Sequence, residues 1–141
     1  MHGTTIAILL GKWNVHLPHW RILSNVKHSS PELLTKNIIY ILYNDGHWTV
    51  YTVFDSTHTE LFDSLRQQPH IDGVETCSHQ LQSPTDDNCG EWILMYIFCR
   101  FACNMSMRSF VNKMKSRTRD DVSRLINNIY ISINSTFLSS L

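Results

Sequence analysis

The sequence lacks any long hydrophobic run. Its longest apolar stretches are "IAILL", "NIIYILY" and "WILMYIF", and each is well below the roughly 18 residues that a membrane-spanning helix requires. The segment "MHGTTIAILLGK" contains neither a basic leader nor a small-residue cleavage site, so it does not look like a secretory signal peptide. We therefore expect a soluble protein that is not secreted and has no membrane partner.

An excess of charge of one sign and paired cysteines are also missing. Charged residues make up 17% of the chain and the formal net charge is +0, so the composition indicates neither disorder nor charge-driven coating of nucleic acid. The four cysteines form no CxxC pair, which favours free thiols. "HLPH", at 16–19, is the one close pair of metal-ligand residues, and no matching pair stands at zinc-finger spacing.

The order of the hydrophobic patterns predicts an α+β fold. Residues 1–141 contain no internal repeat or linker, so we expect a single domain of ordinary size. "NIIYILY", "NDG" and "HWTVYTVF" predict a β-hairpin, which "TELFDSL" extends into an antiparallel meander. Further strands are expected in "TIAILL" and "TCSHQLQ", and a brief helix after Ser30-Pro31.

Two helices are predicted beyond the meander. Residues 92–103 are apolar nearly all round, which is typical of a buried central helix. The C-terminal stretch "RDDVSRLINNIYISINSTFLSSL" has apolar residues at helical spacing, which predicts an amphipathic helix. The expected architecture is a central, mostly antiparallel sheet packed against the buried helix.

Cys89 lies in "DDNCGEW", where a polar loop meets that helix. Asp87 or Asn88 is a suitable N-cap, and the free amides and dipole of a first helical turn favour a thiolate over a thiol. Gly90 leaves room beside the sulfur for a substrate carbonyl. A lone cysteine at a helix start is more often a packed thiol, so reactivity depends on the partners that the fold brings to it.

The chain offers each partner that a nucleophilic cysteine needs. His47 begins a predicted strand and is the candidate base. Asp63, at the end of the next strand, is the candidate acid to orient it, with Asp55 and Glu60 as alternatives. Gln82, seven residues before Cys89, is the candidate donor to an oxyanion. Taken singly, each residue also has a simple non-catalytic explanation. His47 would be an ordinary edge-strand histidine, Asp63 a cap or turn residue, and Gln82 a solvated loop side chain.

Together, "GHW" at 46–48, "LFDSL" at 61–65 and "QSPTDDNCG" at 82–90 resemble the cysteine proteases that include the adenovirus maturation protease (adenain) and the SUMO-deconjugating enzymes. The order His, acid, Gln, Cys is that of the family. The spacing from Gln82 to Cys89 and "LGKWNVHLPHW", at 10–20, resemble the adenoviral branch. Asp63 stands where adenoviral enzymes typically have Glu, although Asp is usual in the SUMO branch.

The resemblance implies a papain-like fold in a circularly rearranged order, with the nucleophile at the N-terminus of the central helix. It implies a monomeric viral endopeptidase, acting in the virion and host nucleus, that cleaves structural precursor proteins at glycine-containing sites. Catalysis would use Cys89, His47, Asp63 and Gln82 without a metal or organic cofactor. Activation by a short peptide and by DNA is implied as well, although the neutral chain argues against DNA and Cys77 is displaced from the family's peptide-linking cysteine.

Two other functions remain open from the sequence. A ubiquitin or SUMO isopeptidase would use the same four residues, and the adenoviral branch itself implies deubiquitination as a side reaction. A module that binds metal or nucleic acid without catalysis would draw on the eight histidines and four cysteines.

Overall fold

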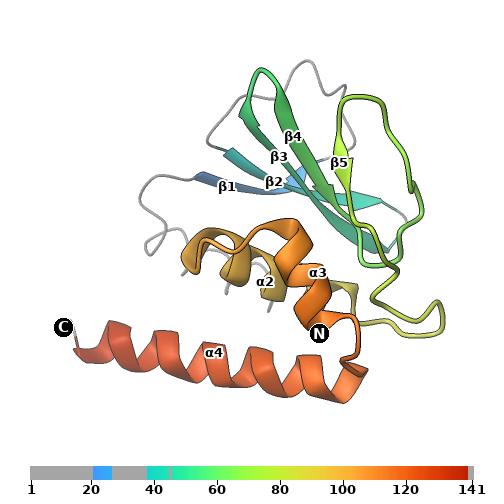
Figure 1. Ribbon diagram of the computed structural model, residues 1–141. Coiled ribbons are helices and arrows are strands. Elements are labelled where there is room, and N and C mark those ends of the chain that lie inside the picture. The colour runs from blue at the N-terminus through green and yellow to red at the C-terminus, as the bar shows by residue number, and fades with distance from the viewer. Residues whose placement is uncertain (1–20, 27–37, 45, 140–141) are drawn as a thin grey trace.

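The fold consists of a mixed five-stranded sheet and a set of helices on one of its faces (Figure 1). It was obtained as a computed structural model, and it describes residues 21–26, 38–44 and 46–139. The strands, in their order across the sheet, are β1 (Arg21–Val26), β2 (Ile38–Asn44), β3 (His47–Asp55), β4 (His58–Phe62) and β5 (Glu75–Thr76). The α+β class expected from the sequence is confirmed.

Strands β2, β3 and β4 form the predicted antiparallel meander. The two outer pairs, β1 with β2 and β4 with β5, are parallel, so the sheet is antiparallel at its centre and mixed as a whole. Gly46 has a φ of 80°, a conformation that glycine adopts without steric cost. The turn at Gly46 makes His47 the first residue of β3.

The helices are stacked beneath the sheet in two layers (Figure 1). Helix α2 (Cys89–Ile97) packs against β3, a π-helical turn, η2 (Phe98–Ala102), continues it, and α3 (Met107–Met114) follows. Helix α4 (Arg119–Ser139) packs on α2 and lies on the side remote from the sheet. Within the described residues no helix combines the length and apolar character needed to cross a membrane.

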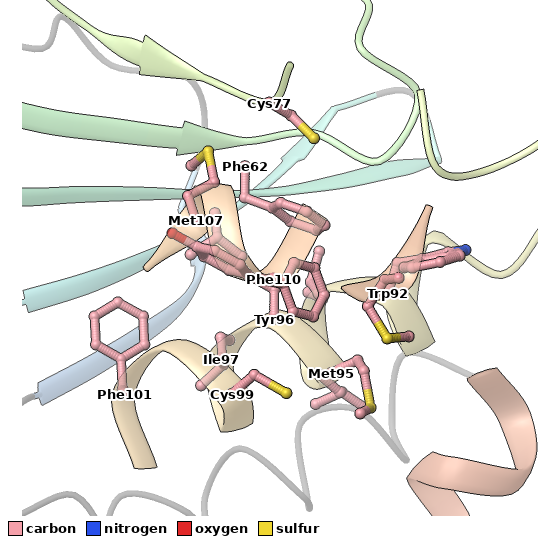
Figure 2. Close-up of a cluster of buried hydrophobic side chains, with 14 of the residues drawn as sticks. Phe62, Cys77, Trp92, Met95, Tyr96, Ile97, Cys99, Phe101, Met107 and Phe110 are labelled. Atoms are coloured by element: carbon pink, nitrogen blue, oxygen red, sulfur yellow. The ribbon is translucent and has the colours of Figure 1, made fainter. Parts of the chain in front are cut away.

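The main core lies between the sheet and α2, and aromatic rings form its centre (Figure 2). Phe62 of β4 stacks on Tyr96 of α2 with ring centroids 4.3 Å apart. Phe110 of α3 meets both rings edge-on, at 5.5 and 5.6 Å. Such offset and edge-to-face pairs add stability beyond the area that they bury. Every residue of α2 is buried, as its apolar sequence predicts, so the position of Cys89 is set by the core.

Several predicted elements differ from the structure. The strand expected in residues 76–82 is wrong beyond Thr76, because the backbone amides of Leu81 and Gln82 both donate to the carbonyl oxygen of Ser64. The predicted central helix begins at Cys89, after the expected N-cap position Asn88, but it changes to π-helical geometry at Phe98. Strand β1 and helix α3 were not predicted. The strand in "TIAILL", the helix after Ser30-Pro31 and "HLPH" lie outside the described residues.

Candidate active site

The fold places Cys89 and His47 together, although 42 residues separate them in the chain. Cys89 is the first residue of α2, and its thiol donates to the carbonyl oxygen of Gly46 at 3.7 Å. The hairpin turn therefore touches the helix start, and His47, the next residue, hydrogen-bonds Cys89. Asn88 is the N-cap residue by position, but its side chain makes no capping hydrogen bond.

Asp63 holds the other side of the His47 ring. His47 Nε2 lies 2.6 Å from Asp63 Oδ1, so Nδ1 is the nitrogen available to the thiol. Asp63 follows the last residue of β4, and its carboxylate also accepts the backbone amides of Leu65 and Gln67. These bonds fix the carboxylate, and the carboxylate fixes the orientation of the imidazole.

The charges of the three groups support one another. Burial disfavours the charged form of His47, but the hydrogen bonds to Asp63 and Cys89 outweigh it and raise the pKa of His47 to about 9. Burial likewise opposes a thiolate at Cys89, yet the hydrogen bond from His47 and the backbone amide of Trp48 lower the pKa of the thiol. The pKa of Asp63 is lowered too, against burial, by its hydrogen bond with His47. The arrangement favours a thiolate–imidazolium pair over a neutral thiol and imidazole.

Two other buried cysteines lack the charged partners that Cys89 has, and their thiol pKa values change in the opposite direction. Cys77 and Cys99 are buried like Cys89, and burial raises the pKa of both thiols, that of Cys99 to about 11. All four cysteines are free thiols, as the sequence analysis expected. Cys103 is the exposed one.

The Gln82 side chain is buried and is held by hydrogen bonds at both ends of its amide group. Its Oε1 accepts the hydroxyl of Ser64 at 2.6 Å, and its Nε2 donates to the carbonyl oxygen of Asp86 at 2.8 Å. One N–H of the Gln82 amide remains without an acceptor among the described residues. Since Asp86 is three residues before Cys89, this hydrogen bond ties the Gln82 amide to the loop that leads into α2.

Ser64 is a residue whose role the sequence did not reveal. It is fully buried, and its carbonyl oxygen accepts the amides of Leu81 and Gln82, each at 2.9 Å, while its hydroxyl holds the Gln82 side chain. It also directly follows Asp63. The only sequence signal was a small hydroxyl residue beside the candidate acid, which is common in turns.

The alternative acids are engaged elsewhere. Asp55 accepts the amide and hydroxyl of Thr57 in the β3–β4 turn. Glu60 is buried and pairs with Arg100, which donates to both of its carboxylate oxygens. Neither carboxylate orients His47.

Among the residues that the structure describes, one group of side chains has the composition of a metal site. Ligand atoms of His58, Glu60 and Glu75 lie within 4.8 Å of one another. However, Tyr96 and Arg100 donate three hydrogen bonds to the Glu60 carboxylate, so its charge is already balanced and its oxygens are occupied. This donor set does not fit a divalent cation, which needs free carboxylate oxygens.

Comparisons with known proteins give no family assignment. No protein-family model matches the chain, and no curated protein matches it in sequence.

Proposed function

We propose that the chain is a cysteine endopeptidase of the adenain-like type, with a papain-like site in circularly rearranged order. The observation that carries the proposal is the Cys89–His47–Asp63 arrangement at the start of a buried helix, with the pKa of the cysteine lowered and that of the histidine raised. A structural thiol has no need of this arrangement. Perturbed groups that support one another in this way are typical of catalytic sites.

In the proposed mechanism the Cys89 thiolate attacks the scissile carbonyl carbon. The His47 imidazolium then gives its proton to the leaving amine, and the neutral ring accepts a proton from the water that hydrolyses the thioester. Asp63 keeps the ring oriented and favours its charged form. The oxyanion is stabilised by the Cys89 backbone amide, which has no intrahelical acceptor because it is at the helix start, and by the remaining N–H of Gln82.

The substrates, location and activators follow from the resemblance. We propose precursor proteins of a virion, cleaved at glycine-containing sites in the virion and the host nucleus. Activation by a short peptide belongs to the same proposal. A role for DNA is weakly supported, since the net charge is +0.

The decisive experiment compares two cysteines of opposite accessibility. A peptide carrying a thiol-reactive electrophile should label Cys89, which is 6% exposed, faster than the exposed Cys103, because ionisation and not access controls the reaction. Cys89→Ala should abolish both labelling and peptide hydrolysis, whereas the matched variant Cys103→Ala should leave both unchanged. Labelling that follows exposure, with full hydrolysis by Cys89→Ala, would refute the proposal.

The isopeptidase function has one feature in its favour, the aspartate at position 63. The same site would cleave an isopeptide bond to ubiquitin or SUMO. Parallel assays on such conjugates and on glycine-containing peptides separate the two functions, and the substrate with the higher kcat/KM identifies the main one.

A further inference from the structure

Two hydrogen bonds fix the amide group of the Gln82 side chain, one at each end. The carbonyl oxygen of Asp86, which can only accept, receives a hydrogen from Nε2 at 2.8 Å, and the Ser64 hydroxyl donates to Oε1 at 2.6 Å. The bond to Asp86 therefore decides which end of the amide is the nitrogen. The bond from Ser64 holds the opposite end, so the two together prevent rotation of the amide group.

The bond from Ser64 lies in the interior of the protein. The exposed fraction is 0% for Ser64 and 2% for Gln82. Hydrogen bonds away from water are stronger than those in water, and bonds that follow one another in a chain polarise each other. Because the Ser64 hydroxyl draws electron density towards Oε1, the Nε2–H groups become better donors. The N–H that bonds the oxyanion in the proposed mechanism therefore gains strength from a hydroxyl at the other end of the amide.

Ser64 also holds the backbone of Gln82, through a different atom. Its carbonyl oxygen accepts the backbone amides of Leu81 and Gln82, each at 2.9 Å. These two bonds do not involve the hydroxyl, so they remain when the hydroxyl alone is removed. The effect of the hydroxyl on the Gln82 amide can therefore be measured separately from the attachment of the loop.

The backbone just after Ser64 is kept in an unfavourable conformation. Arg66 has a φ of 52°, in the left-handed region that residues other than glycine seldom adopt. Its amide donates to the carbonyl oxygen of Asp63 at 3.1 Å, and its Nε donates to that of Cys77 at 3.0 Å. Such strain persists where surrounding contacts enforce it, and it is concentrated at functional sites. The turn that follows Asp63 and Ser64 therefore indicates a functional demand on this segment.

We propose that Ser64 is a positioning residue of the oxyanion hole, because its hydroxyl fixes the Gln82 amide and strengthens the remaining N–H as a donor. The inference rests on the proposed function, since it takes Gln82 to stabilise an oxyanion formed at Cys89. Ser64 acts through Gln82 and does not touch the substrate. Its hydroxyl therefore contributes in the transition state, where the oxyanion exists, and not to substrate binding.

The test compares Ser64→Ala, which removes the hydroxyl, with Ser64→Thr, which keeps it. The matched control is Ser83→Ala, because Ser83 is the next residue after Gln82 but is exposed, and its hydroxyl pairs with Thr85 at 3.1 Å. Three reactions are measured on each folded protein. A glycine-containing peptide reports hydrolysis, the corresponding peptide aldehyde reports binding of a tetrahedral adduct, and iodoacetamide reports alkylation of the sulfur without any oxyanion.

Ser64→Ala should lower kcat about tenfold and change KM by less than about twofold. The effect is smaller than the loss of a whole oxyanion donor, about 10²–10³, because the bond to Asp86 remains. The inhibition constant of the aldehyde should rise by the same factor as kcat falls. Alkylation of Cys89 and the alkaline limit of hydrolysis should not change, since His47 and Asp63 are untouched. Ser64→Thr should stay within about threefold of wild type, and Ser83→Ala should match it in every assay.

A wild-type kcat in folded Ser64→Ala would overturn the inference and leave the protease proposal standing. Equal falls in hydrolysis and alkylation would also overturn it, because a purely structural role predicts that result. Ser64→Cys, which supplies a weaker donor, replaces Ser64→Ala if the alanine variant does not fold, and its kcat should again fall without a change in KM. Absence of hydrolysis by the wild-type protein would remove the proposed function and this inference together.

Discussion

Replacing Asp63 with asparagine tests the electrostatics of the site. The variant keeps the size of the side chain and removes the charge that lies 2.6 Å from His47 Nε2. In the parent protein burial lowers the pKa of His47, and the bonds to Asp63 and Cys89 raise it, so that it reaches about 9 instead of 6.5. Without the Asp63 charge, burial, which is the largest influence on the ring, opposes only the Cys89 bond, and the pKa should fall to about 6.5 or lower.

The size of the effect follows from these values. At pH 7.5 a group with a pKa of about 9 is about 97% protonated, whereas one with a pKa of about 6.5 is about 9% protonated. The fraction of protein holding imidazolium beside thiolate should therefore fall roughly tenfold in Asp63→Asn. The rate of labelling by a peptide electrophile at pH 7.5 should fall by the same factor, and by more if the ring also loses its orientation.

Because the pKa of His47 is raised, the direction in which stability and activity change with pH can be predicted. A raised pKa in the folded state means that the charged ring stabilises the protein fully below pH 6.5, and that this contribution disappears as the pH rises through about 9. Peptide hydrolysis should decline over the same alkaline range. In Asp63→Asn the loss of this stabilisation and the decline of peptide hydrolysis should both occur at a lower pH, about 6.5.

The assay is an NMR titration of the His47 ring protons, with labelling rates of Cys89 measured from pH 5.5 to 10. Asp72→Asn is the control, because Asp72 also pairs with a histidine, His70 at 2.9 Å, but in full exposure, where water screens the pair. It should leave the Cys89 rates unchanged. A His47 pKa that stays near 9 in Asp63→Asn would refute the reasoning.

Three further predictions concern stability. Arg100→Met leaves the buried Glu60 carboxylate without its bidentate partner and should lower the free energy of unfolding by about 3 kcal/mol in urea titrations. The control Arg124→Met changes an exposed arginine and should barely change the midpoint. Equal effects of the two substitutions would contradict the prediction. Asn88→Leu removes a buried amide with no partner among the described residues, so the melting temperature should stay or rise, and a clear fall would show a hidden partner. Ser64→Ala removes the donor to a buried glutamine oxygen and should lower the free energy of unfolding by about 1–3 kcal/mol in the same titrations. An unchanged midpoint would contradict this prediction.

The parts of the fold that the sequence predicted well are those that local patterns determine. The alternation in "HWTVYTVF", the "NDG" turn and the apolar run after Cys89 each specify one element through short-range preferences. His47, Asp63 and Cys89 each stand at the boundary of such an element, whereas Gln82 lies in a loop and was selected by its spacing of seven residues from Cys89. Their predicted catalytic roles remain predictions.

The parts that were missed depend on contacts between distant residues. Ser64 and Gln82 are 18 residues apart, and no local pattern indicates that a serine will hold a glutamine. Strand β5 has only two residues, and β1 and β5 both join the sheet by parallel pairing with β2 and β4, which residues distant in the sequence determine. The same holds for the pairing of Glu60 with Arg100, which excluded Glu60 as an alternative acid only once the fold was known.

Ser64 gives the site a property that concerns its motion. Asp63 holds the His47 base and Ser64 holds the Gln82 oxyanion donor. Because Asp63 and Ser64 are consecutive, one short piece of backbone positions both His47 and Gln82. A displacement of this end of β4 relative to α2 would carry the imidazole and the Gln82 amide together. The Gln82–Asp86 hydrogen bond opposes such a displacement, because it ties the donor to the loop that leads into α2.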